Sequence, residues 1–430
     1  MLDELKNELE KTYKRKIRDR GDCEALVQDI YEKTGAVMSY NTIRRMYGLA
    51  EFRKPRESTL DYLSKYCGFQ SYKDFCQRYS EIDQWPTWEH LYVVLSEVDP
   101  QKTIDFLRLR KRQEDQFSLA FTIIVRELIN RGDYAKLELI FNEPLFQYSV
   151  LPYDQVAQIG VLVGLHFRNF DNEQLESQLL LLPNFRDIVL KIFVDYNRLN
   201  GKYGRWIEFL YAQRELDNET KTFVTAILIW RNHLNQLSVP HLLLRQLPEL
   251  SMEQHPILFG RLFGLKLLNS SSKKEQKKLI SIMEDRLKSE VTKIGELLYI
   301  PVVQSLVLNS KPHDDLIINY QTLIHQISHW YHVSLVAIHR IYQVRILIRQ
   351  KEFSKARVIL ENIPFGHIRH GYREFLDVYI SFFRMKIAQG LAENFEQLHS
   401  DFTLNRKLLT YPIFTDAYFE NYFEDEKSIN

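Results

Sequence analysis

Side chains that can contact DNA are concentrated between Ser39 and Arg56. At about 100° per residue, Ile43, Met46 and Tyr47 fall on one side of a short helix. Asn41 and Arg45 point the opposite way, and Thr42 and Arg44 lie on the flanks. Ser39 is a suitable N-cap, and a helix this short must pack its apolar side on neighbours. The polar side would then face outward, which is the arrangement of a DNA recognition helix. The predicted DNA-contacting residues are Ser39, Tyr40, Asn41, Thr42, Arg44, Arg45, Arg53, Lys54 and Arg56.

Each of these side-chain types matches a particular feature of DNA. Arg44 and Arg45 can pair with guanine or phosphate, and Asn41 can pair with adenine. Ser39 and Tyr40 lie at the N-terminal end of the helix, where phosphates bind backbone amides and hydroxyls. The basic side chains of the following loop would hold the DNA backbone. The alternative is an ordinary solvated face, and which of the two arginines contacts a base stays open.

This segment is locally positive, although the whole chain is nearly neutral. Eight basic and four acidic residues lie between Ser39 and Arg78, whereas the 430-residue chain has a formal net charge of +1. The chain is therefore not a polycation with general affinity for nucleic acid. The local balance is compatible with a small DNA footprint.

The composition predicts a protein that is mostly or entirely α-helical. Its 15 glycines and 13 prolines are few for this length, and runs rich in Leu, Ile, Glu, Lys and Gln favour helices joined by short loops. The three cysteines show no C-x-x-C spacing, and the N-terminus has no apolar signal segment. No apolar run is long enough to cross a bilayer. These features predict a cytoplasmic protein with no membrane partner.

Further helices are expected around the Ser39 helix within the first 80 residues. A first amphipathic helix should end near Gly21, and Asp22 should cap a second helix that Gly35 ends. The expected buried side of this second helix is Leu26, Val27, Ile30 and Tyr31. Helices over 59–67 and after Ser71 complete a compact helix-turn-helix module.

Two stretches of this module have a distinctive spacing: SYNTIRRMYG at 39–48 and STLDYLSKYCGF at 58–69. Together they resemble the bacterial Cro/repressor-like helix-turn-helix family. Members carry a Ser-x-x-Thr-Leu-Arg-Arg-x-x-Gly segment and a Thr-Leu-Asp-x-Leu-x-x-Tyr-x-Gly-Phe helix, and Ile43 stands here where Leu is usual. The resemblance covers roughly the first 80 residues and implies that the Ser39 helix binds DNA.

The remaining chain is expected to contain connector helices over 81–115, a helical repeat domain over 116–423 and a frayed tail over 424–430. The stretch ILIRQKEFSKARVILENI at 346–363 resembles the centre of a tetratricopeptide repeat, with Ala356 in its second helix. The predicted fold is therefore all-α: a small helix-turn-helix bundle followed by a long tetratricopeptide-like solenoid.

Three turns in the repeat domain share a pattern of an apolar helix, a polar turn and an aromatic residue that opens the next helix. They lie at 130–134, 199–203 and 349–353. Their separations are close to multiples of the ~34–40 residues of a paired-helix repeat.

A histidine stripe is the one candidate metal site. His325, His329 and His332 would lie close together on an unbroken helix, with His339 seven residues further on, and imidazoles spaced in this way can bind Zn²⁺. Groove or interface residues are the alternative, which the absence of an H-E-x-x-H motif and of a nearby cysteine favours. No metal or cofactor is therefore predicted.

Catalytic motifs are also missing. The sequence has no G-x-x-x-x-G-K-[ST], G-x-G-x-x-G or G-x-S-x-G pattern. Cys23, Cys67 and Cys76 could be redox sensors but are better explained as small core residues. We predict that the chain is not an enzyme.

The sequence thus predicts a transcriptional regulator that binds double-stranded DNA. The combination of modules resembles peptide-sensing regulators, which implies a peptide or protein ligand in the repeat domain. A homodimer is expected, because one small module offers few phosphate contacts. The alternative is a helical-repeat scaffold, for example in a phage-defence or stress assembly, whose N-terminal bundle binds protein.

Overall fold

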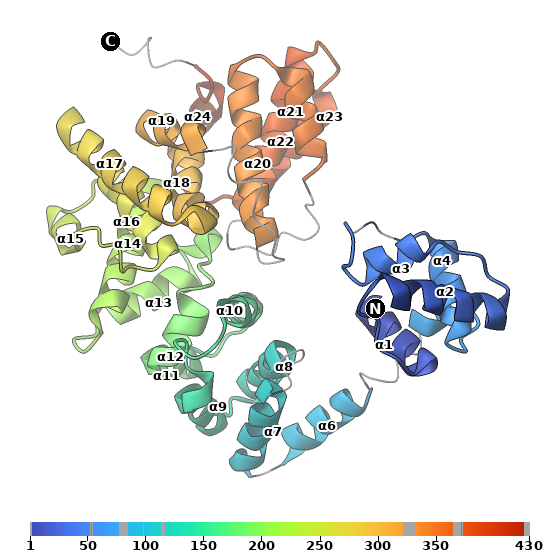
Figure 1. The fold of residues 1–430 in the computed structure, drawn as a ribbon. Coiled ribbons are helices and arrows are strands. Elements are labelled where there is room, and N and C mark those ends of the chain that lie inside the picture. Colours follow the sequence, from blue (N-terminus) through green and yellow to red (C-terminus); the bar gives the residue numbers. More distant parts are fainter. Residues whose placement is uncertain are drawn as a thin grey trace. The chain divides into compact units, whose positions relative to one another are not determined.

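The computed structural model describes residues 2–51, 53, 55–76, 85–97, 99–112, 117–320, 332–363, 371 and 373–424. Every regular element in these residues is a helix, so the predicted all-α class is confirmed (Figure 1). None of the helices in this part of the chain has both the length and the apolar character needed to cross a membrane. The chain divides into two compact units, Met1–Thr103 and Ile104–Asn430.

The first unit is a bundle of short helices. Its helices are α1 (Leu2–Tyr13), α2 (Arg20–Thr34), α3 (Tyr40–Met46), α4 (Glu57–Tyr66) and α6 (Trp85–Ser96), and residues 72–76 are also helical. Helix α7 (Pro100–Arg112) begins in this unit and ends in the second, so both α6 and α7 lie in the expected connector segment. The core of the bundle is made of side chains from α1 to α4, joined by Phe75.

Two helix boundaries in the first unit differ from the prediction. α1 ends at Tyr13 rather than near Gly21, and Asp19 rather than Asp22 is the N-cap of α2. The Asp19 carboxylate accepts from the Asp22 N–H at 2.9 Å, and the Asp22 carboxylate accepts from the Asp19 N–H at 3.3 Å. This reciprocal capping box starts α2 three residues earlier than expected. The predicted stop at Gly35 is confirmed, with φ of 69° and its N–H bonded to the Tyr31 carbonyl.

The buried side of α2 is narrower than predicted. Leu26 and Ile30 are fully buried and Val27 is partly buried in the bundle core, but Tyr31 is 51% exposed. The helices that pack on α2 cover its Leu26–Ile30 side and leave the Tyr31 edge uncovered. Tyr31 is therefore a surface residue.

The Asp19 cap gives a first testable expectation. Asp19→Ala should destabilise α2 by about 1 kcal/mol, because it leaves a first-turn amide without an acceptor. Amide hydrogen exchange across α2 in the full chain should then be about fivefold faster. Glu24→Ala is the control, since it removes only an exposed ion pair with Arg20 and should change the exchange little. Equal effects of the two substitutions would contradict the capping role.

The second unit contains the remaining helices. Its α-helices are α8 (Phe117–Arg131), α9 (Tyr134–Asn142), α10 (Tyr153–Phe167), α11 (Glu173–Leu181), α12 (Pro183–Phe185), α13 (Lys202–Tyr211), α14 (Asn218–Leu234), α15 (His241–Gln246), α16 (Pro256–Leu268), α17 (Lys273–Ser289), α18 (Ile294–Leu308), α19 (Lys311–Tyr320), α20 (His332–Arg349), α21 (Phe353–Glu361), α22 (Arg373–Gly390), α23 (Glu396–Arg406) and α24 (Asp416–Glu420). Three 3₁₀ turns, η1 (Pro144–Phe146), η3 (Tyr196–Arg198) and η4 (Val291–Lys293), and one π-helix, η2 (Arg186–Leu190), lie between them.

These helices pack largely on their near neighbours in the sequence. Through the middle and C-terminal part, α14 contacts α16, α16 contacts α18, α18 contacts α20, and α20 contacts α22. The approach of α16 to α18 requires glycine, because a Cβ at Gly260 would lie 2.2 Å from the Leu297 carbonyl oxygen. The resulting layers of helices are visible in Figure 1 from α14 to α23.

Two of the three predicted turns are confirmed. α8 ends at Arg131 and α9 begins at Tyr134, and α20 ends at Arg349 and α21 begins at Phe353 with Ala356 buried. The turn at 199–203 differs, because a π-helix and a 3₁₀ turn precede it in place of an amphipathic α-helix. The tetratricopeptide class of the domain stays a prediction. In the predicted tail, residues 425–430 lie outside the described residues.

The C-terminal part of the chain contacts the irregular segment that contains η2 and η3. The Tyr411 hydroxyl donates to the Tyr196 carbonyl at 2.7 Å and accepts from the Leu199 N–H at 2.8 Å. The Asn197 amide donates to the Gly371 carbonyl at 2.7 Å. Residues separated by about half the chain therefore meet around η2 and η3.

Candidate nucleic-acid interface

Helix α3 separates its apolar and polar side chains. The Ser39 hydroxyl accepts from the Asn41 N–H at 3.3 Å and caps the helix. Ile43 and Met46 are buried in the bundle core. The Tyr47 hydroxyl donates to the Lys6 carbonyl at 3.0 Å, which ties the end of α3 to α1. These contacts orient α3 so that its other side is available to a ligand.

The two arginines of α3 have different surroundings. Arg44 donates to the Asn41 side-chain oxygen at 3.0 Å and to the Leu49 carbonyl at 3.4 Å, so it links the helix to the turn that follows. Arg45 is half-buried, and its side chain has no hydrogen-bond or ion-pair partner in the described part of the chain. The hydrogen-bond donors of Arg45 are therefore available to a ligand. Those of Arg44 are partly used by Asn41 and the Leu49 carbonyl.

The start of α3 lies against the start of α2. The Arg20 guanidinium lies 5.0 Å from the centre of the Tyr40 ring, a cation–π arrangement. Tyr40 and Thr42 are both half-buried. Arg20 was not among the predicted contacts, because its position beside Tyr40 follows from the packing of α2 on α3 and from no sequence motif.

The basic loop after α3 is partly described. Arg53 and Arg56 are exposed, and Arg56 immediately precedes α4. Pro55 between them is buried. Lys54 lies outside the described residues. Arg53 and Arg56 are thus exposed on either side of a buried residue, where they could contact a DNA backbone.

The weak metal candidates gain no support from the described residues. His325 and His329 lie outside them, as does the side chain of His332. His339 is buried in the core. Across the described ranges, no group of three or more His, Cys, Asp or Glu side chains could hold a metal ion.

The three cysteines are free thiols in or beside the bundle core. Cys23 is fully buried, and Cys67 and Cys76 are half-buried. Burial raises the pKa of Cys67 to about 11 and also raises the pKa of Cys23. Both thiols are therefore protonated at neutral pH, which is the opposite of what a nucleophilic or redox-sensing cysteine requires.

Comparison of the chain with protein-family models, with curated proteins and with solved structures found no match.

Proposed function

We propose that the chain is a sequence-specific transcriptional regulator whose first unit binds double-stranded DNA through α3 and the loop after it. The observation that carries this proposal is the division of α3, with Ile43 and Met46 in the core and the donors of Arg45 left without a partner among the described residues. A cation held on a capped, anchored helix is pre-organised for a base edge or phosphate. Exposed Arg53 and Arg56 add backbone contacts nearby in the sequence.

The proposal assigns different roles to the two arginines. Arg45 contacts the DNA directly, and Arg44 positions α3 through its bonds to Asn41 and the Leu49 carbonyl. A base contact from an arginine contributes about 1–3 kcal/mol of discrimination, which is roughly 5- to 150-fold in affinity. If Arg45 instead contacts a phosphate, its loss would weaken binding of all sequences equally and lower the salt slope by about one.

The test begins with selection of genomic fragments by the purified full chain. Affinities for an enriched duplex and a scrambled duplex are then measured from about 50 to about 300 mM salt. Arg45→Ala should weaken binding of the enriched duplex at least about fivefold and reduce the preference for it over the scrambled duplex. Arg131→Ala is the matched control, because it removes an exposed arginine that pairs with Glu127 in the second unit.

Two results would overturn the proposal. One is the enrichment of no duplex at any salt concentration. The other is an Arg45→Ala variant that binds as well as Arg131→Ala does. Within the same proposal, the second unit receives a peptide or protein ligand and a homodimer places two copies of α3 on two half-sites. Light scattering of the chain with and without the enriched duplex measures the number of copies.

A scaffold role is the second candidate, because the first unit exposes apolar side chains. Val37, in the turn between α2 and α3, is 81% exposed, and Tyr31 is 51% exposed. An exposed apolar side chain favours association with a protein that covers it, because the apolar surface is then removed from water. Under this alternative, Val37→Asp would abolish capture of a protein partner, and the chain would enrich no DNA.

A further inference from the structure

A cavity in the second unit lies where the C-terminal part of the chain meets the irregular segment 186–196. Its lining includes side chains from this segment, from α14 and from α16, together with Gly371. One wall includes Asp187 of the π-helix η2, in which the Lys191 N–H bonds to the Arg186 carbonyl five residues earlier, at 2.8 Å. Such five-residue spacings are rare and occur often at functional sites. The cavity is therefore built from non-local contacts around an unusual backbone segment.

Arg261, in the middle of α16, is the exceptional residue of this cavity. It is 4% exposed and lines the cavity, and its guanidinium lies 5.6 Å from the Tyr196 ring centre and 5.2 Å from the Phe223 ring centre. No carboxylate, carbonyl or hydroxyl within the described residues accepts a hydrogen bond from it. A buried guanidinium without an acceptor is costly, because its lost hydration is not replaced.

The other buried arginines of the second unit show how this chain ordinarily compensates such a charge. Arg186, Arg286 and Arg345 are each 5% exposed or less. Their acceptors are the Leu180, Leu181 and Asp217 oxygens for Arg186, the Ser251, Gln254 and Glu290 oxygens for Arg286, and the Ser305, Asn309 and Asp314 oxygens for Arg345. Arg261 is the one of these four that lines the cavity and the one without an acceptor in the described residues. This contrast indicates that its acceptor comes from a ligand.

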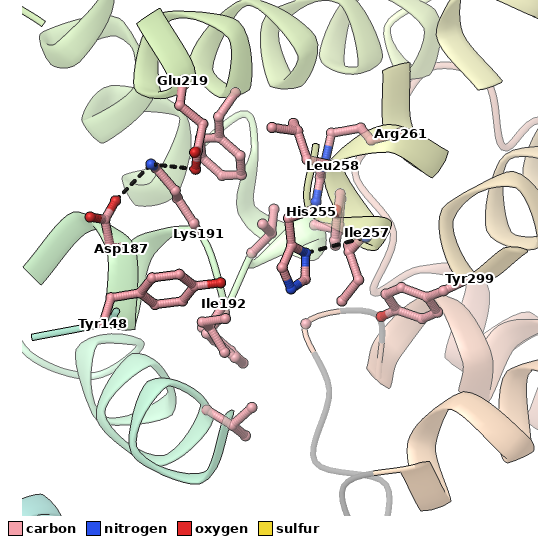
Figure 2. A pocket seen from close by; sticks show the side chains of 16 residues that line it. Tyr148, Asp187, Lys191, Ile192, Glu219, His255, Ile257, Leu258, Arg261 and Tyr299 are labelled. Atoms are coloured by element: carbon pink, nitrogen blue, oxygen red, sulfur yellow. Dashed lines mark hydrogen bonds and ion pairs between the residues drawn. The ribbon is translucent and has the colours of Figure 1, made fainter. Parts of the chain in front are cut away.

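The wall opposite Arg261 has a different charge pattern. Lys191 lies 2.6 Å from an Asp187 oxygen and 2.9 Å from a Glu219 oxygen, so its charge is already compensated by two carboxylates. Figure 2 shows this trio on one side of the cavity and Arg261 and His255 on the other. The two acidic side chains would repel a ligand with several negative charges. The uncompensated charge of the cavity is therefore the single charge of Arg261.

His255 is a neutral side chain beside Arg261. Its Nδ1 accepts from the Ile257 N–H at 3.3 Å and caps α16, so the ring proton belongs on Nε2. Burial lowers the pKa of His255 to about 4, which keeps the ring neutral at pH 7. In Figure 2 the other ring nitrogen points into the cavity.

We propose that this cavity binds a small organic monocarboxylate, whose carboxylate pairs with the guanidinium of Arg261. The planar guanidinium matches a carboxylate in shape and charge. The cavity volume of about 70 Å³ corresponds to roughly five to seven water-sized positions, which sets the size of the ligand. Ile192, Phe223, Ile257 and Leu258 provide apolar surface for a short hydrocarbon body. The inference goes beyond DNA binding and does not depend on it.

The experiment uses the full chain and measures binding of butyrate by calorimetry. Butyramide has the same shape without the charge, and inorganic phosphate supplies charge without the apolar body. Butyrate should bind, and the other two should not bind measurably. Arg261→Gln should weaken butyrate binding at least about tenfold, because it removes the charge and the fork of donors. Arg205→Gln is the matched control, since Arg205 lies on the exposed side of α13, and it should leave binding unchanged.

Thermal unfolding supplies a second readout without ligand. Because Arg261 is an uncompensated buried charge, Arg261→Gln should unfold at the same or a higher temperature than the unsubstituted chain. Arg261→Lys keeps the charge but loses the fork and should also weaken butyrate binding. The inference is overturned if butyrate does not bind, if butyramide or phosphate binds equally well, or if Arg261→Gln and Arg261→Lys both keep the affinity of the Arg205→Gln control.

Discussion

Acidification from about pH 7 to about pH 5 is expected to lower the free energy of unfolding of the second unit by several kcal/mol. Burial lowers the pKa of His313 and of His339 to about 4 in the folded chain, against about 6.5 in an unfolded chain. The unfolded chain therefore binds more protons between these values. The contribution of each neutral histidine is present above about pH 6.5 and is lost as the pH falls toward about 4.

Each of these two histidines should contribute a loss of about 2 kcal/mol at pH 5, which together is a large part of the ~5–15 kcal/mol that stabilises a typical domain. The pKa of His255 is lowered by burial as well and acts in the same direction. Burial raises the pKa of Asp195 and of Asp377. Protonation of these two carboxylates therefore raises the free energy of unfolding on acidification and offsets part of the loss. The net direction remains a loss.

Urea unfolding followed by circular dichroism at about pH 7, 6 and 5 measures this dependence. His339→Gln keeps a polar side chain that does not titrate, so it should reduce the pH-dependent loss by about 2 kcal/mol. His399→Gln is the control, because His399 is exposed on α23. If His339→Gln and His399→Gln lose the same stability between pH 7 and pH 5, the buried histidine is not the cause.

Asp314→Ala is expected to destabilise the second unit by about 3–5 kcal/mol, because it leaves Arg345 buried without its counter-charge. Arg345 is fully buried and donates two hydrogen bonds to Asp314, at 2.9 and 3.1 Å. Arg349 donates a third at 2.8 Å, and the Tyr342 hydroxyl donates another at 2.5 Å. Although burial opposes ionisation, the charge of Arg345 holds the pKa of Asp314 below its ordinary value. The carboxylate thus joins α19 to α20.

The neighbouring Asp315 provides the control for this substitution. It is exposed one residue further along α19, so Asp315→Ala should change the stability by no more than about 0.5 kcal/mol. Both variants are compared by urea unfolding at pH 7, where the Asp314 carboxylate is ionised. A loss below about 1 kcal/mol for Asp314→Ala would show that Arg345 finds another acceptor, and the proposed link between α19 and α20 would be wrong.

The features of the fold that depend on near neighbours in the chain were predictable from the sequence. The helical class, the Ser39 cap, the Gly35 stop and the burial of Ile43 and Met46 are all as expected. Each depends on residues within about four positions, because helix caps and helical faces have that range. The wrong start of α2 shows the limit of such patterns, since Asp19 and Asp22 are equally good caps by type and only the reciprocal bonds choose between them.

The candidate DNA contacts were predictable as a group but not as individuals. Helical spacing places Arg45 opposite the apolar side of the helix and Arg44 on its flank, but it does not show which arginine contacts a base. The structure gives Arg44 two acceptors and Arg45 none among the described residues. One of those acceptors, the Leu49 carbonyl, lies in the turn beyond the helix, and the path of that turn is not encoded in helical periodicity. Arg20 beside Tyr40 is a further example.

By itself, then, the sequence determined that the chain is all-α, where a few of its helices begin or end, and that α3 has one apolar and one cationic side. In the sequence, the only sign of the cavity is Arg261 within the apolar stretch 256–268, and no acidic residue lies in that stretch. Only the tertiary structure decided that Arg261 lacks an acceptor among the described residues while Arg345 has several. The physical reason is distance along the chain. Capping and amphipathicity act over one or two helical turns, whereas Asp314 and Ser305, which compensate the buried charge of Arg345, lie 31 and 40 residues away and are brought to it by packing.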